Sequence, residues 1–187
     1  MKKKIDFFFY FFVDNIYKMN PSSSHSIKKR SKANDVFITP IEIAKQQINL
    51  HNINEGELWL DPCRNNEEGS YYSNFPNGVS KDWCEIIENK DFFEYNNKPD
   101  VICGNPPYSI IDKWIEKTLE LCPREFSLLI GIGNLTARRI QLIENCGYGL
   151  TKMKMLKIYK WYGMSCIVVF EKNKKSIIEY DRKVYRV

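Results

Sequence analysis

Residues 104–108 read Gly-Asn-Pro-Pro-Tyr and hold the side chains of this chain best suited to chemistry. The two prolines fix φ at successive positions and restrict the residue before each, so the turn that they form is rigid. Asn105 offers a side-chain amide oxygen and Pro106 a backbone carbonyl oxygen, which are two acceptors on one stiff bend. Two aimed acceptors suit an NH2 group, because hydrogen bonds to its protons draw electron density onto a nitrogen that is otherwise a poor nucleophile.

The neighbours of this pair extend the prediction. Pro107 completes the Pro-Pro pair, and Tyr108 presents a flat face on which a planar group such as a flipped base can stack. The turn follows the apolar run 101–103, so we expect it at the end of a strand, where side chains of an α/β sheet meet ligands. An isolated Asn-Pro-Pro can equally do no more than end a strand, so the turn alone leaves both interpretations open.

The Asn-Pro-Pro-Tyr motif resembles the catalytic motif of the S-adenosylmethionine-dependent methyltransferases that modify amino groups, above all the DNA adenine-N6 type. The catalytic residues that the resemblance implies are Asn105, Pro106, Pro107 and Tyr108. It implies S-adenosylmethionine as the cofactor and a direct transfer of its methyl group to an exocyclic amine. The fold that it implies is a Rossmann-like class I methyltransferase.

Further segments resemble the same family and follow in the same order: Phe-x-Thr-Pro at 37–40, Asp-Pro-Cys at 61–63, Asp-Trp-Cys-Glu-Ile at 82–86 and Asp-Phe-Phe at 91–93. The cofactor-binding residues that the resemblance implies are Phe37, Thr39, Asp61, Pro62, Gly69, Glu85, Asp91 and Phe92. Glu85 would accept the ribose hydroxyls, and Trp83 is a candidate to pack against the adenine ring. Asp91 would accept the adenine amino group while Phe92 stacks.

The loop after residue 63 departs from the family pattern. The family continues Asp-Pro-Cys with Gly-x-Gly, whereas residues 64–69 read Arg-Asn-Asn-Glu-Glu-Gly and keep only Gly69. Glycines there let the backbone approach a ligand closely. The departure therefore motivates an alternative from another class, a catalytically silent nucleic-acid-binding subunit that supports an active partner.

The substrate is predicted less sharply than the reaction. The order of the cofactor-side segments favours adenine in DNA, while an RNA amine or a protein glutamine amide remains the alternative within enzymes. Between residues 61 and 105 the chain is too short for an inserted target-recognition domain. Sequence specificity must then be slight or come from the tail and loops or a partner, so the expected partners are nucleic acid and a specificity subunit or a second copy of the chain.

Hydrophobic patterning predicts an α/β fold, a mostly parallel seven-stranded sheet closed by a C-terminal antiparallel hairpin. The predicted strands are 57–63, 82–86, a third element that ends at 91–93, 101–103, 126–130, 152–159 and 165–171. Capping boxes at 39–42 and 109–112 predict two helix starts, and a further helix is expected over 134–146.

The last predicted hairpin interleaves basic and aromatic side chains. This pattern suits phosphate contact with base stacking, and the nucleic-acid-binding residues predicted from it are Lys154, Lys157, Lys160, Trp161 and Tyr162. Lysines on the solvent face of an edge strand also protect against aggregation. The two interpretations have equal support from the sequence.

Charge and composition divide the 187 residues into two parts. Residues 1–35 carry eight Lys or Arg against three Asp or Glu, and we expect them to form a disordered basic arm ahead of one methyltransferase domain over 36–187. Residues 1–18 are interpreted as an untranslated upstream extension or a floppy appendage, with Met19 as the alternative start.

Two classes of protein are disfavoured. The apolar run 5–13 is shorter than the roughly 20 residues that span a bilayer, so no membrane anchor is expected. Six cysteines without close spacing and only two histidines make a zinc site improbable and indicate reduced thiols in an intracellular protein.

Overall fold

The computed structural model describes residues 37–65, 71–159, 161 and 163–183. Several predictions fall outside these ranges: the basic arm over 1–35, Gly69, Lys160 and Tyr162. All six cysteines lie inside them and are free thiols.

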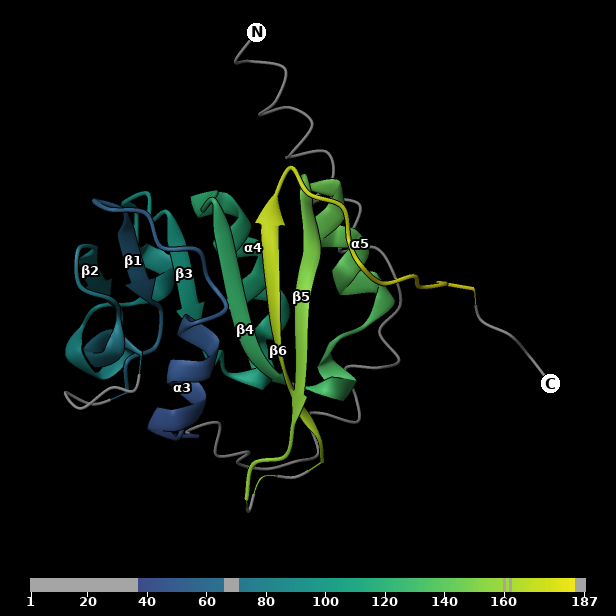
Figure 1. Ribbon diagram of the computed structural model, residues 1–187, viewed down its shortest axis with the longest axis horizontal. Coiled ribbons are helices and arrows are strands. Elements are labelled where there is room, and N and C mark those ends of the chain that lie inside the picture. Colours follow the sequence, from purple (N-terminus) through teal and green to yellow (C-terminus); the bar gives the residue numbers. More distant parts are fainter. Residues whose placement is uncertain (1–36, 66–70, 160, 162, 184–187) are drawn as a thin grey trace, which may run out of the picture. The chain divides into compact units, whose positions relative to one another are not determined.

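A sheet of six strands runs through the described part of the chain (Figure 1). The strands are β1 (Leu58–Asp61), β2 (Ser80–Trp83), β3 (Val101–Gly104), β4 (Glu125–Gly131), β5 (Tyr148–Leu156) and β6 (Ser165–Lys172). Their order across the sheet is β2-β1-β3-β4-β6-β5. Strands β1 to β4 run parallel, and β6 is antiparallel to both β4 and β5, which confirms the predicted α/β sheet with its closing hairpin.

Helices cover both faces of this sheet (Figure 1). They are α3 (Ile41–Ile48), α4 (Ile111–Leu121) and α5 (Ala137–Asn145), with 3-10 turns η1 (Tyr72–Asn74), η2 (Ile86–Glu88), η3 (Phe92–Glu94), η4 (Tyr108–Ile110) and η5 (Ile132–Asn134). On one face, Ile115 of α4 and Ile143 of α5 join a core with Phe126. On the other, Ala44 of α3 packs in a cluster with Trp59. None of these described helices is long and apolar enough to cross a membrane.

The seventh predicted strand is absent from the described residues, because the chain after β2 folds into two 3-10 turns. The carboxylates of Glu85 and Asp91 each accept a hydrogen bond from the backbone N–H two residues further along. Asn89, between them, takes a left-handed φ of 58°. Such local bonds satisfy the backbone in a turn and compete with a strand ladder. The second strand also ends earlier than predicted, at Trp83.

Both predicted capping boxes are wrong. Helix α3 begins after Pro40, α4 begins after the 3-10 turn η4, and neither has a side-chain cap. Thr39 is buried, and its side chain hydrogen-bonds with Tyr71 instead. Tertiary contacts therefore outweigh the local preference of this threonine for a helix start.

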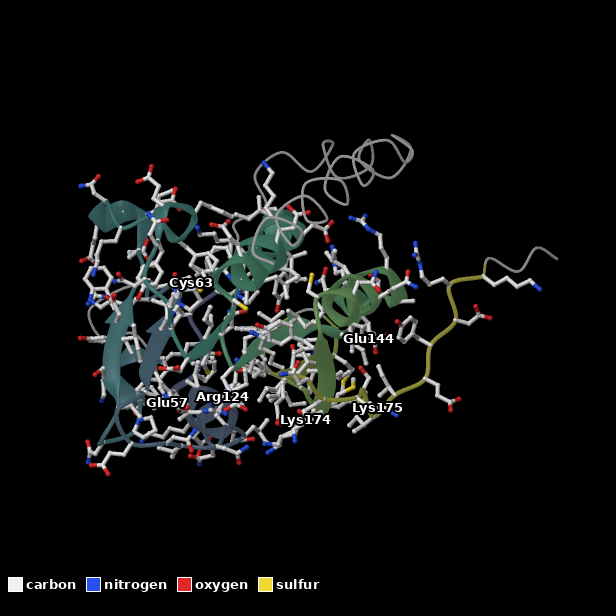
Figure 2. All side chains as sticks on the ribbon, turned by 90° about the horizontal axis from the view of Figure 1, so that it is seen from above. Glu57, Cys63, Arg124, Glu144, Lys174 and Lys175 are labelled. Carbon is white, nitrogen blue, oxygen red and sulfur yellow. The ribbon has the colours of Figure 1, made fainter. Side chains whose placement is uncertain are left out.

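An ionic clamp joins the first and fourth strands at their amino-terminal ends. Arg124 donates to both carboxylate oxygens of Glu57, at 2.7 and 2.9 Å, and lies 2.9 Å from Oε1 of the buried Glu125 (Figure 2). Burial alone would raise the pKa of Glu125, but His51 and Arg124 outweigh it and hold that pKa below its ordinary value. The clamp fixes the end of the sheet opposite to the strand ends that carry Asp61 and Gly104.

Replacing Arg124 with alanine should lower the free energy of unfolding by about 3 kcal/mol, at the low end for a broken buried ion pair because Arg124 is one-third exposed. Urea unfolding at pH 7 measures this. Arg138→Ala is the matched control, since its 3.7 Å pair with Asp112 is exposed and should contribute less than about 1 kcal/mol.

The same comparison depends on pH. Because the folded pKa of Glu125 is lowered, its contribution is present above the ordinary pKa of 4.5 and is lost as the pH falls through the folded value. The gap between wild type and Arg124→Ala should therefore narrow in acid. A gap that widens, or equal losses in the two variants, contradicts this account.

Candidate active site

The site lies where the strand order reverses. Strand β1 pairs with β2 on one side and β3 on the other, so the chain leaves β1 and β3 in opposite directions across the sheet. In open α/β sheets, ligands bind outside the carboxyl ends of strands at such a switch point. Asp61 ends β1 and Gly104 ends β3, which places both predicted motifs at this edge, as the sequence predicts.

The catalytic turn packs directly on the Asp-Pro-Cys turn. A Cβ on Gly104 would lie 2.9 Å from Cδ of Pro62, so only glycine lets the two turns approach this closely. The thiol of Cys63 donates to the backbone carbonyl of Asn105 at 3.1 Å (Figure 2). Burial raises the pKa of Cys63 well above its ordinary value, so the thiol keeps the proton that it donates.

The side chain of Asn105 is anchored by its nitrogen. Nδ2 donates to the backbone carbonyl of Phe37 at 3.1 Å, and a carbonyl can only accept, so the nitrogen must face it. Neither Oδ1 of Asn105 nor the carbonyl oxygen of Pro106 accepts a hydrogen bond from the residues that the structure describes. The half-buried turn therefore presents the two acceptors that the sequence predicts.

Three aromatic rings meet beside this turn. Phe37 stacks on Tyr108 with ring centroids 6.5 Å apart and an interplanar angle of 21°. Its other neighbour is Trp161, at 5.4 Å and 59°. The predicted stacking residue, the predicted cofactor-covering residue and the tip of the β5–β6 hairpin thus form one cluster.

The lysines of the hairpin have different environments. Lys157 donates to the carbonyls of Trp161 and Gly163, so it holds the tip of the hairpin together. Lys154 is exposed on β5. Of the predicted basic contacts that the structure describes, Lys154 is therefore the one better placed to meet a phosphate.

Asp61 is fully buried between the two turns. Its oxygens accept from the backbone N–H groups of Cys63 at 3.2 Å and Tyr72 at 3.1 Å. Burial raises the pKa of Asp61 to about 7, although these hydrogen bonds act in the opposite direction. Asp61 and the buried Pro62 therefore shape the loop that follows β1.

The other predicted cofactor contacts have local partners. Glu85 accepts from the backbone of Asn65 at 2.7 Å as well as from its own turn. Asp91 caps η3, and Phe92 is buried with its ring centroid 4.4 Å from that of Trp114. Their cofactor roles stay predictions.

Large apolar side chains are nevertheless exposed in this region. Ile86 is 69% exposed and Ile87 83%, and Phe93 is 37% exposed. The sequence analysis passed over all three. The signal was two isoleucines directly after the acidic Glu85, in a segment too short to bury them.

Arg64, which stands where the family has a glycine, takes up the neighbourhood of Trp83. Its guanidinium lies 3.6 Å from the centroid of the indole ring and 2.5 Å from Oε1 of Glu88. Lys90 also lies 3.8 Å from the same centroid. The predicted packing of Trp83 against adenine therefore meets two cations already on the ring.

Gln47 is a second residue that sequence reasoning missed. It is fully buried at the end of α3 and donates to the carbonyl of Gly104 at 3.1 Å and to Oγ of Ser127 at 2.9 Å. Its own oxygen accepts from the hydroxyl of Tyr71 at 2.8 Å. The available signal was a polar residue three positions after Ala44, on the apolar face of the helix.

Three solved structures are similar to the chain. TrmN from Thermus thermophilus has a TM-score of 0.50 and 15% identity over 73% of this chain and 50% of that one. A precorrin-6y C5,15-methyltransferase from Geobacter metallireducens GS-15 gives 0.51 and 12% over 76% and 92%, and a methyltransferase from Pyrococcus furiosus gives 0.53 and 15% over 77% and 88%. The chain has the class I methyltransferase fold.

At these identities the likeness shows the fold alone. This chain spans about half the length of TrmN. No protein-family model matches it, and a search of curated proteins gives no match. In the described part of the chain, no group of three or more His, Cys, Asp or Glu side chains is arranged to hold a metal ion.

A cavity of about 430 Å³ lies at the opposite edge of this methyltransferase fold. Its lining includes Glu144, Lys174 and Lys175 (Figure 2). These residues adjoin the end of β6 and the start of β5, whereas the start of β6 pairs with the carboxyl end of β4. The cavity is therefore separate from the candidate site.

Gly104→Ala tests the contact between the two turns. The added methyl group would overlap Pro62, so we expect the free energy of unfolding to fall by about 1–3 kcal/mol. Gly133→Ala is the control, because it lies one loop away with no atom within 4 Å of the added Cβ and no left-handed φ. Thermal or urea unfolding measures both, and similar behaviour of the two variants would rule out the close approach.

Proposed function

We propose that this chain transfers a methyl group from S-adenosylmethionine to an exocyclic amino group, with adenine N6 in DNA as the favoured acceptor. The observation that carries the proposal is the anchored amide of Asn105. Its nitrogen is held by Phe37, so its oxygen is left to accept from a substrate beside a cluster of aromatic rings.

The residues at the switch point fit such a cofactor. The exposed Ile86 and Phe93 offer apolar surface for a purine ring near the carboxylate of Glu85. Each oxygen of Glu85 accepts one backbone N–H and keeps a lone pair for a hydroxyl. When bound, S-adenosylmethionine supplies a methyl group on a positively charged sulfur.

The chain itself supplies position and electrostatics. A planar base stacks on Tyr108, with Phe37 and Trp161 as further walls, and its NH2 protons point at Oδ1 of Asn105 and the carbonyl of Pro106. These acceptors favour the pyramidal nitrogen of the transition state. The nitrogen lone pair forms the new N–C bond as the C–S bond breaks, the sulfur keeps the bonding electrons, and water takes the leaving proton.

A nucleic acid suits the surroundings of this site. Lys154 and the 84%-exposed Tyr159 lie on the same hairpin as Trp161, which suits phosphate contact and stacking. An RNA amine or a protein glutamine amide presents the same NH2 group and is the alternative substrate. A specificity subunit or a second copy would supply target selection.

A silent nucleic-acid-binding subunit is the second candidate. It is favoured by Arg64, whose guanidinium covers Trp83 where the family has a glycine-rich loop. Transfer of tritiated methyl groups to DNA, RNA and total protein, side by side, separates the candidates. Calorimetric titration with S-adenosylmethionine completes the test, and no binding at millimolar cofactor would favour the silent subunit.

Asn105→Ala should abolish methyl transfer and leave cofactor affinity nearly unchanged, because the amide contacts the acceptor amine rather than the cofactor. Asn96→Ala is the control, since the Asn96 amide bonds only locally, to the carbonyl of Glu94. Full activity in Asn105→Ala would overturn the catalytic assignment. The readouts are single-turnover methyl transfer and calorimetry.

Binding of the cationic cofactor should release protons near neutral pH. With its pKa raised to about 7 by burial, Asp61 is about half protonated at pH 7, and a nearby positive charge lowers that pKa. We expect about half a proton released at pH 7 and almost none at pH 9, where Asp61 is already ionised. Calorimetry in buffers of different ionisation enthalpy measures this, with Asp91→Asn as control. A binding enthalpy independent of buffer at pH 7 contradicts the assignment.

A further inference from the structure

We propose that Gln47 is a positioning residue of the catalytic turn, and that its amide sets the orientation of Asn105 through the carbonyl of Gly104. The inference rests on the proposed function for its kinetic arm alone. It concerns a residue on α3, far in sequence from the turn that it holds.

Every polar group of the Gln47 side chain has a partner. Both protons on Nε2 are used, on the carbonyl of Gly104 and on Oγ of Ser127, and Oε1 accepts from Tyr71. A fully buried amide with all of these bonds made has one allowed orientation. It is therefore a rigid support.

The geometry of the peptide bond carries this support to Asn105. The carbonyl of Gly104 and the N–H of Asn105 belong to one planar unit, so holding the carbonyl fixes the plane from which Asn105 projects. Cys63 holds the next carbonyl, that of Asn105 itself, from the β1 loop. Peptides on both sides of the catalytic residue are thus held by different elements.

Helix α3 and the segment before it hold Asn105 twice. Phe37 accepts from the side-chain amide, and Gln47 donates to the backbone behind it. The two contacts span one helix, so displacement of α3 would move both. Gln47 is the interior member of this pair.

Behind Gln47, a buried chain of groups fixes Ser127. Nε2 of His51 lies 2.7 Å from Oγ of Ser127, and Nδ1 of His51 lies 3.2 Å from Oε1 of Glu125. All three residues are buried, which denies a substrate access to this serine. The arrangement supports the Gln47 amide and is not a hydrolytic triad.

Gln47→Glu provides a switchable test. An ionised carboxylate cannot donate to the Gly104 carbonyl, whereas a protonated carboxyl can, and burial raises the pKa of such a group toward neutrality. We expect kcat for methyl transfer to DNA that lacks methyladenine to fall about a hundredfold when the introduced group is ionised, the scale for a misplaced reacting group. It should recover in acid, with KM for DNA unchanged.

The control is Gln46→Glu, which adds the same charge to the same helix at a half-buried position. Its pH profile should follow wild type. The titratable groups that face position 47 are Tyr71, Cys103 and, through Ser127, His51. Burial raises the pKa values of Tyr71 and Cys103 well above the range of the assay, and the wild-type profile accounts for His51.

A spectroscopic arm needs no activity. The backbone amide nitrogen of Asn105 shares its peptide with the Gly104 carbonyl, so its ¹⁵N shift reports the hydrogen bond from Gln47. In Gln47→Glu this shift should titrate with the midpoint of the kcat profile and stay constant in Gln46→Glu. If wild type methylates nothing, the proposed function fails while this shift still decides the role of Gln47.

Gln47→Met covers the case in which a buried carboxylate prevents folding. It keeps the volume, loses both donated bonds, and should show low kcat and a displaced Asn105 signal at every pH. A wild-type kcat with an unmoved Asn105 signal in either folded variant overturns the proposal. So does an equal change in Gln46→Glu.

Discussion

The carbonyl oxygen of Phe37 decides which way the catalytic amide faces. A backbone carbonyl can only accept a hydrogen bond, so the amide nitrogen of Asn105 turns toward it and the amide oxygen is left for a substrate. An amide with the opposite orientation would present donors to an amine, which has protons of its own to donate. The proposed chemistry therefore depends on a contact between residues 68 positions apart.

Close packing of two turns makes this contact possible. Gly104 brings the catalytic turn against Pro62, and the thiol of Cys63 then reaches the carbonyl of Asn105. The prolines limit the turn internally, but its placement comes from neighbours on β1 and α3. Stiffness within the motif and support from outside are separate requirements, and both are met at this edge of the sheet.

Predictions from the sequence succeeded where the physics is local. Two successive prolines and an apolar run suffice to predict a rigid bend at the end of β3, and the alternation of elements predicts the parallel sheet. They failed where a side chain had two local options. Glu85 and Asp91 cap turns in place of a further strand, and Thr39 bonds to Tyr71 in place of capping a helix. Gln47 was missed because its partners are distant in sequence.

By itself, the sequence determined the types of group at the site, two oxygen acceptors and an aromatic ring on a stiff bend, since covalent geometry restricts proline and the residue before it. Only the tertiary structure decided how these groups face. The orientation of the Asn105 amide, the burial that raises the pKa of Asp61, and the approach of Trp161 to Phe37 all arise between segments that the sheet brings together. Hydrogen bonding and desolvation act over ångströms in space, and separation along the chain does not report them.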